Sequence, residues 1–178
     1  QDTTHRTAMG VDSDPIPMLF GGINTAIADL ASMQISTDLT DALFGTPKLI
    51  ISRANLGVLE EDAINIAIHG HSPLLAEAVV AASTQMNDLA KRVGATRFNI
   101  IGICCTGNEA LMRRGVPLAA ASSSQELVLL SGILDAMVVD YQCIMPSISI
   151  IRRCFHTRII TTEPVGHMVG ATHIELTP

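Results

Sequence analysis

Three residues that can bind soft metal ions, His71, Cys105 and Cys143, each follow a short apolar run of the sequence. The runs cover residues 64–68, 98–103 and 136–139. We expect each run to be a strand of one parallel sheet, and ligands bind where the carboxyl ends of such strands meet. Two thiolates and one imidazole suit zinc, copper(I) or iron–sulfur chemistry. The spacing therefore indicates a metal site that only tertiary folding assembles.

Cys104 and Cys105 are adjacent, at the point where the strand expected over 98–103 turns into a helix. Thr106 and Glu109 have the spacing of a capping box, which predicts that the helix begins near Thr106. A helix N-terminus lowers the pKa of a nearby thiol and so favours the thiolate, which is the metal-binding form. If the strand pattern persists, Cys104 faces away from Cys105, and we expect it to have a structural role.

The neighbouring residues leave two interpretations open, a metal site and an ordinary core. His69 and His71 share one face of an extended chain. We expect one imidazole to bind the metal and the other to form a hydrogen bond or to orient the first. Cysteine is, however, among the most frequently buried residue types, and an isolated histidine at a strand end is usually structural. Cys154 is interpreted as core. The other histidines lack supporting spacing: His5, His156, His167 and His173.

Apolar runs and turn signals alternate along the chain. Strands are expected at 64–68, 98–103, 118–121, 136–139 and 158–161, with an edge strand at 48–52. Helices are expected at 20–33, 38–44, 73–92, 106–114, 124–134 and 145–153. The alternation predicts an α/β fold, a Rossmann-like three-layer single domain over residues 1–178 with a mostly parallel sheet. The sequence contains no Walker A, G-x-G-x-x-G or H-E-x-x-H motif.

Composition narrows the function classes. The formal net charge is −6, and the only aromatic residues are four phenylalanines and one tyrosine, which argues against nucleic-acid binding. Hydrophobic residues make up 48% of the chain and charged residues 16%, with a mean hydropathy of +0.38. We interpret this excess as a buried sheet plus surface that other parts of a larger protein cover; a well-buried single domain is the alternative. No uninterrupted apolar stretch is long enough to predict a membrane span.

The number and spacing of the cysteines bear on the cellular compartment of the protein. Four cysteines, two of them adjacent, fit cytosolic thiols at functional positions better than a disulfide framework, so we predict a cytoplasmic protein. No signal peptide is recognisable. The first residue is Gln1 rather than methionine, and we expect the chain to be cut from a longer protein.

Three motifs carry a resemblance to a known family. Residues 69–73 (HGHSP), 102–109 (GICCTGNE) and 140–144 (DYQCI) resemble the anaerobic nickel–iron carbon monoxide dehydrogenases. Supporting segments lie at 5–10, 43–47 and 154–158, so the match covers essentially the whole chain. The most similar type is the subunit that partners acetyl-CoA synthase. The resemblance implies a Rossmann-like middle domain that is a fragment of a larger catalytic subunit.

The resemblance also implies a cofactor, the nickel–iron–sulfur C-cluster. In this sequence the matching residues are His71 and Cys105, which would hold the iron outside the cubane portion, and Cys143, which would bind a cubane iron. Asp29 aligns with an acidic residue that supports proton transfer. The remaining cluster ligands, the catalytic lysine and histidine, and the additional 4Fe-4S relay clusters belong to segments that this chain lacks.

The reaction implied for the parent enzyme is CO + H2O to CO2, two electrons and two protons. Its implied partners are a ferredoxin-like electron carrier, a second copy in a homodimer, the remaining domains of the subunit and acetyl-CoA synthase. The isolated chain is expected to be inactive. The competing prediction is a metal-free α/β scaffold or interaction module, in which the cysteines are ordinary core residues.

Overall fold

The structure is a computed structural model that describes residues 1–175. Residues 1–46 form a helical unit, and a second unit begins at Pro47. The helical unit contains α1 (Asp2–Ala8) and α2 (Pro15–Phe44). The first 46 residues contribute no strand, and the single Rossmann-like domain over residues 1–178 stays a prediction.

Helix α2 is one continuous helix where the sequence predicts two. Asp14 caps it by accepting a hydrogen bond from the Ile16 N–H at 2.9 Å, and Pro15 occupies its first position. Residues 34–37 contain neither glycine nor proline, so nothing interrupts the helix between the two predicted segments. The helix ends at Gly45, whose φ of 87° is accessible to glycine.

Helix α2 also bears on the prediction that the chain has no membrane span. Within residues 1–175, α2 is the one helix long and apolar enough to cross a membrane, with a hydropathy of 1.2 over its most apolar window. The sequence does not show this as an uninterrupted apolar run, because polar residues such as Asn24, Thr25 and Asp29 interrupt it. Core helices of larger proteins satisfy the same criterion, so length and composition alone do not indicate a membrane.

The second unit is built on a six-stranded parallel sheet in the order β3-β2-β1-β4-β5-β6. The strands are β1 (Ile64–His69), β2 (Phe98–Ile103), β3 (Leu118–Ala120), β4 (Ala136–Val139), β5 (Arg158–Thr161) and β6 (Thr172–His173). This is the doubly wound Rossmann order, whose direction reverses between β1 and β4. The α/β prediction is confirmed.

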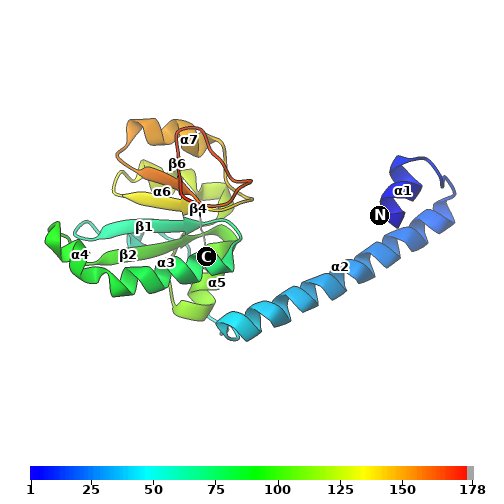
Figure 1. Ribbon diagram of the computed structural model, residues 1–178, viewed down its shortest axis with the longest axis horizontal. Helices are drawn as coiled ribbons and strands as arrows, with labels where there is room; N and C mark the ends of the chain where they lie inside the picture. The colour runs from blue at the N-terminus through cyan, green and yellow to red at the C-terminus, as the bar shows by residue number, and fades with distance from the viewer. Residues whose placement is uncertain (176–178) are drawn as a thin grey trace. The chain divides into compact units, whose positions relative to one another are not determined.

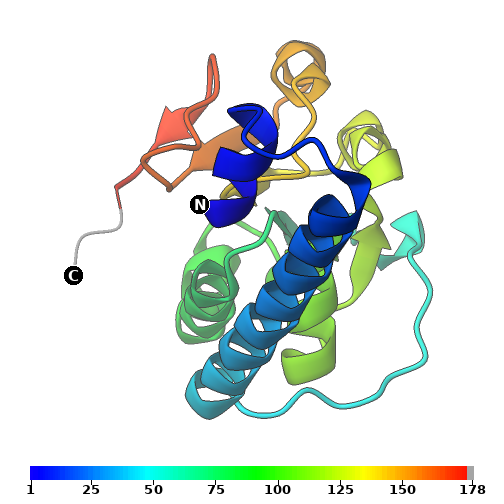
Figure 2. The same ribbon diagram turned by 90° about the vertical axis from the view of Figure 1, so that its right-hand side faces the viewer.

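Helices cover both faces of the sheet. They are α3 (Pro73–Gln85), α4 (Asn87–Arg92), α5 (Cys104–Arg114), α6 (Glu126–Leu130) and α7 (Ser147–Ile151), with 3-10 turns η1 (Leu56–Val58), η2 (Ser122–Ser124) and η3 (Arg152–Cys154). Figures 1 and 2 show α3 and α5 on one face and α6 and α7 on the other. Two cores result. Ile68 packs toward Ala76 and Ala110 on the first face, and Ala67 packs with Leu129 and Ile148 on the second.

Most predicted elements are present, but some differ. Residues 48–52 form no strand, and Leu49 and Ile51 in this segment are fully exposed. The helix predicted over 73–92 is divided at Met86, and the one predicted over 124–134 shortens to α6. Strand β6 was missed because it has only two residues, too few to form a periodic pattern.

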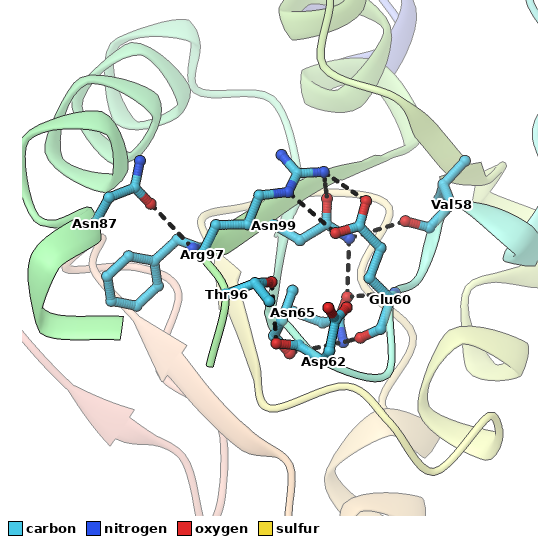
Figure 3. Close-up of polar contacts among 10 residues, drawn as sticks. Val58, Glu60, Asp62, Asn65, Asn87, Thr96, Arg97 and Asn99 are labelled. Carbon is cyan, nitrogen blue, oxygen red and sulfur yellow. Dashed lines mark hydrogen bonds and ion pairs between the residues drawn. The ribbon is translucent and has the colours of Figure 1, made fainter. Parts of the chain in front are cut away.

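A polar network holds the amino ends of β1 and β2 together (Figure 3). Asn65 is buried and accepts hydrogen bonds from the Glu60 N–H at 3.0 Å and from the side-chain amide of Asn99 at 2.9 Å. It also donates to the carbonyls of Glu60 at 2.8 Å and Ile133 at 2.9 Å. Arg97 adds an ion pair to the Glu60 carboxylate. One side chain thus joins three segments at the edge opposite the candidate site.

We predict that Asn65→Ala lowers the free energy of unfolding by about 3 kcal/mol, because it leaves buried amide and carbonyl groups without partners. Urea unfolding of the chain measures this. Lys91→Ala is the control, since it removes only an exposed ion pair to Asp88 and should change stability by less than about 0.5 kcal/mol. Equal stability of the Asn65 variant and the control would show that the network contributes nothing.

Candidate metal site

The carboxyl ends of β1, β2 and β4 lie together at one edge of the sheet. The register pairs His69, the last residue of β1, with both Ile103 of β2 and Val139 of β4. His71 follows β1, and Cys143 follows β4, so these two residues flank the point where the strand order reverses. Ligands of doubly wound folds bind in the crevice at that point.

The structure brings His71 and Cys143 together. The Nε2 atom of His71 lies 3.9 Å from the Sγ atom of Cys143. The Nδ1 atom of His71 lies 3.3 Å from the backbone carbonyl oxygen of Tyr141. The His71 and Tyr141 rings stack with their centroids 6.4 Å apart. A proton on Nδ1 would be donated to this carbonyl, which leaves Nε2 as the free lone pair. Metal-binding histidines are usually oriented in this way.

The two adjacent thiols come from α5. This helix begins at Cys104 rather than near Thr106, and its N-cap, Ile103, makes no side-chain hydrogen bond. The predicted capping box is therefore absent. The Sγ atoms of Cys104 and Cys105 are 3.8 Å apart, so Cys104 does not face away as predicted. The reason is that both thiols lie in a helical turn, where the two-residue alternation of a strand no longer applies.

The surroundings of Cys105 and Cys143 raise the pKa values of both thiols. The pKa of Cys105 is raised to about 11. The larger cause is desolvation of the thiol, and the smaller one is its hydrogen bond with the Cys104 thiol, although the residue as a whole is exposed. A hydrogen bond with Cys104 and then desolvation raise the pKa of Cys143. The expected preference for thiolate at a helix N-terminus is therefore wrong here. A bound cation would have to displace these protons.

His69 is linked to the Cys143 segment through Gln125. It is buried, and its Nε2 atom lies 2.8 Å from the side-chain oxygen of Gln125. Burial lowers the pKa of His69 and so favours the neutral ring. The Gln125 amide in turn donates to the Cys143 carbonyl at 2.8 Å, and its oxygen accepts from the Met145 N–H at 2.9 Å. The sequence did not indicate a role for Gln125, because this residue lies in the turn before α6 and belongs to no recognisable motif.

Backbone strain is concentrated at this edge. Within residues 1–175, the non-glycine residues with positive φ are Cys104 at 61°, Gln142 at 63° and Cys143 at 54°. Residues held in such conformations cluster at functional sites. All three lie in the two segments that present the thiols, so the strain sets where the sulfur atoms point.

The four candidate donors form a row, in which His71 is next to Cys143, Cys143 next to Cys104 and Cys104 next to Cys105. Within the described part of the chain, no three histidine, cysteine or acidic side chains are arranged to hold a single metal ion. A polynuclear iron–sulfur group is larger than one ion and is bound through several irons. Imidazole and thiol donors at one edge therefore fit such a group better than an isolated zinc.

Other predicted residues lie elsewhere. Asp29 is exposed on α2, in the other unit, and its catalytic role stays a prediction. Cys154 is exposed in η3, so its assignment to the core is wrong. It is the last residue of the short turn η3, between α7 and β5.

A family model described as the prismane/CO dehydrogenase family matches residues 1–178. The chain belongs to this family. It is 55% identical to carbon monoxide dehydrogenase 1 of Carboxydothermus hydrogenoformans, covering 96% of this chain and 27% of that protein. It is 49% identical to the beta subunit of carbon monoxide dehydrogenase/acetyl-CoA synthase of Moorella thermoacetica, covering 98% of this chain and 26% of the relative.

Solved CO dehydrogenase structures share the fold. One chain of an acetyl-CoA synthase/carbon monoxide dehydrogenase structure with NiZn[Fe4S4] and NiNi[Fe4S4] clusters superposes with a TM-score of 0.92 at 49% identity, covering 99% of this chain and 26% of that one. The as-isolated, Ni-free carbon monoxide dehydrogenase of Thermococcus sp. AM4 gives 0.88 at 50% identity, covering 98% and 28%. The resemblance seen in the sequence is confirmed, and the chain spans about a quarter of the length of these relatives.

Proposed function

We propose that this chain is the α/β part of an anaerobic carbon monoxide dehydrogenase that interconverts CO and water with CO2, two electrons and two protons. The observation that carries the proposal is the meeting of His71, Cys143 and the Cys104–Cys105 pair where the strand order reverses. Membership of the CO dehydrogenase family supports it across the whole chain.

The cofactor in this proposal is a nickel–iron–sulfur cluster. His71 and Cys105 would hold the iron outside the cubane portion, and Cys143 would hold one cubane iron. When bound, the cluster would supply the metals that bind the substrate, and it would also be the first acceptor of the electrons. The chain's own residues orient and prepare the donors: the Tyr141 carbonyl fixes the His71 ring, and the raised pKa values of Cys105 and Cys143 couple metal binding to proton release.

The partners follow from the same proposal. Segments outside these residues would supply the remaining ligands, the acid and base groups and the 4Fe-4S relay, with Asp29 assisting proton transfer. The electrons would pass to a ferredoxin-like carrier in the cytoplasm, and the subunit would form a homodimer. One relative is named for its association with acetyl-CoA synthase, which supports that enzyme as a further partner.

A metal-free scaffold is the second candidate. It is favoured by one observation, that no three described donors are arranged around a single ion. The exposure of Cys105 and Cys143 argues against it, because cysteines that serve only as core residues are buried.

The test compares the 178-residue chain with the full-length protein, meaning the longer subunit that we propose contains it. Both are purified without oxygen in the presence of nickel and iron, and CO-dependent reduction of a viologen dye is measured. We predict reduction by the full-length protein and none by the chain alone. A full-length protein that contains stoichiometric nickel and iron, yet reduces no dye under CO, would refute the proposed activity.

A further inference from the structure

One buried carboxylate touches all three segments that carry the candidate ligands. Asp140 directly follows β4, and only 1% of its surface is exposed. Its Oδ1 atom accepts a hydrogen bond from the His71 N–H at 2.6 Å, and its Oδ2 atom accepts from the Ser72 N–H at 2.7 Å. Oδ1 also accepts from the Tyr141 N–H, and Oδ2 lies 3.5 Å from the Thr106 hydroxyl.

The close approach of this carboxylate depends on Gly70. A Cβ atom at Gly70 would lie 1.7 Å from the Asp140 Oδ1 atom, and the φ of +132° is one that other residues rarely adopt. The Gly70 carbonyl also accepts a hydrogen bond from the Thr106 N–H at 2.9 Å, which ties the β1 loop to α5. Gly70 therefore does more than end a strand: it makes room for the carboxylate between the loops.

A carboxylate is the side chain that suits this position. Three backbone N–H groups point at it, and its two oxygen atoms have lone pairs enough for all of them. Hydrogen bonds to an ionised acceptor are about twice as strong as neutral ones. An asparagine has the same shape but one acceptor oxygen, so its NH2 group would face a backbone donor.

We propose that Asp140 is a positioning residue for the metal site, one that fixes the His71 loop against the segments of Cys105 and Cys143. It contacts no donor atom itself. It acts through the backbone of His71, through Tyr141, whose carbonyl orients the imidazole, and through Thr106, which follows Cys105. This inference rests on the proposed function, since it assumes that these donors bind metal.

The test is binding of Co(II) alone to the metal-free full chain, followed by the thiolate-to-cobalt absorption and by the apparent dissociation constant. We expect Asp140→Asn to weaken binding by about tenfold or more, the usual effect of losing a group that orients metal ligands. Asp140→Glu keeps the charge and should recover part of the affinity. The matched control is Asp135→Asn, because Asp135 accepts from the Asn65 N–H at 2.8 Å at the opposite edge of the sheet.

Thermal unfolding of each metal-free variant separates stability from positioning. Asp135→Asn should lower the unfolding temperature and leave Co(II) binding as in the unchanged chain. If Asp140→Asn does not fold, the Co(II) affinity of Asp140→Glu is compared with that of the unchanged chain instead. Folded Asp140 variants that bind Co(II) like the unchanged chain, with the same absorption, would overturn the role of Asp140 and leave the proposed function standing. An unchanged chain that gives no thiolate-to-cobalt absorption would overturn the role of Asp140, because that role requires these donors to bind metal.

Discussion

Cys143→Ser is expected to reduce CO-dependent dye reduction by the full-length protein to the background rate. The thiol lies 3.9 Å from the His71 Nε2 atom and presents the soft donor that an iron–sulfur group requires. Serine keeps the size of the side chain but offers a hard hydroxyl. The left-handed φ of 54° at this position strains both residues alike, so the substitution isolates the sulfur. Iron and nickel contents are measured with the activity.

The control is Cys154→Ser, which removes an exposed thiol from η3 in the same α/β unit. It should leave both metal content and dye reduction unchanged. A Cys143→Ser protein that keeps more than half of the activity and its full metal content would show that Cys143 is not a ligand.

Gly107→Ala is expected to lower the free energy of unfolding by about 3 kcal/mol, because the new methyl group overpacks the contact between α5 and β2. A Cβ atom at Gly107 would lie 2.6 Å from the Gly102 carbonyl carbon and 2.8 Å from the Leu118 Cδ1 atom. A Cβ atom at Gly102 would lie 2.5 Å from the Gly107 Cα atom. Helix α5 therefore packs backbone to backbone on β2, and this contact places Cys104 and Cys105 at the edge of the sheet.

Urea unfolding of the chain measures the loss. Gly115→Ala is the matched control at the end of the same helix: its new Cβ would meet open space, and only the φ of +74° opposes it, at a cost of roughly 1 kcal/mol. If the Gly107 variant loses no more stability than the Gly115 variant, helix and strand do not pack as closely as the structure has them.

The sequence was sufficient to predict the strands that position the site. The runs at 64–68, 98–103 and 136–139 became β1, β2 and β4 within one residue, because fully buried strands are continuous apolar runs. The parallel arrangement then followed from the intervening helices. The placement of His71, Cys105 and Cys143 at one edge needed no further information, and their assignment as metal ligands stays a prediction.

The supporting residues could not be predicted in the same way. Asp140 follows an apolar strand, and nothing in the local sequence shows that three backbone donors from other segments surround it. Gln125 likewise acts on residues far away in sequence. Cys104 was expected to face away from Cys105 because the sequence predicted that α5 begins near Thr106, whereas it begins at Cys104.

The central claim is that His71, Cys105 and Cys143 bind the irons of one nickel–iron–sulfur group. The most direct measurement is an anomalous difference map, collected at the iron absorption edge, from crystals of the full-length protein grown without oxygen. We predict iron peaks at bonding distance from the His71 Nε2 atom and from the Sγ atoms of Cys105 and Cys143. Iron peaks elsewhere in the protein, with these three side chains free of metal, would contradict it.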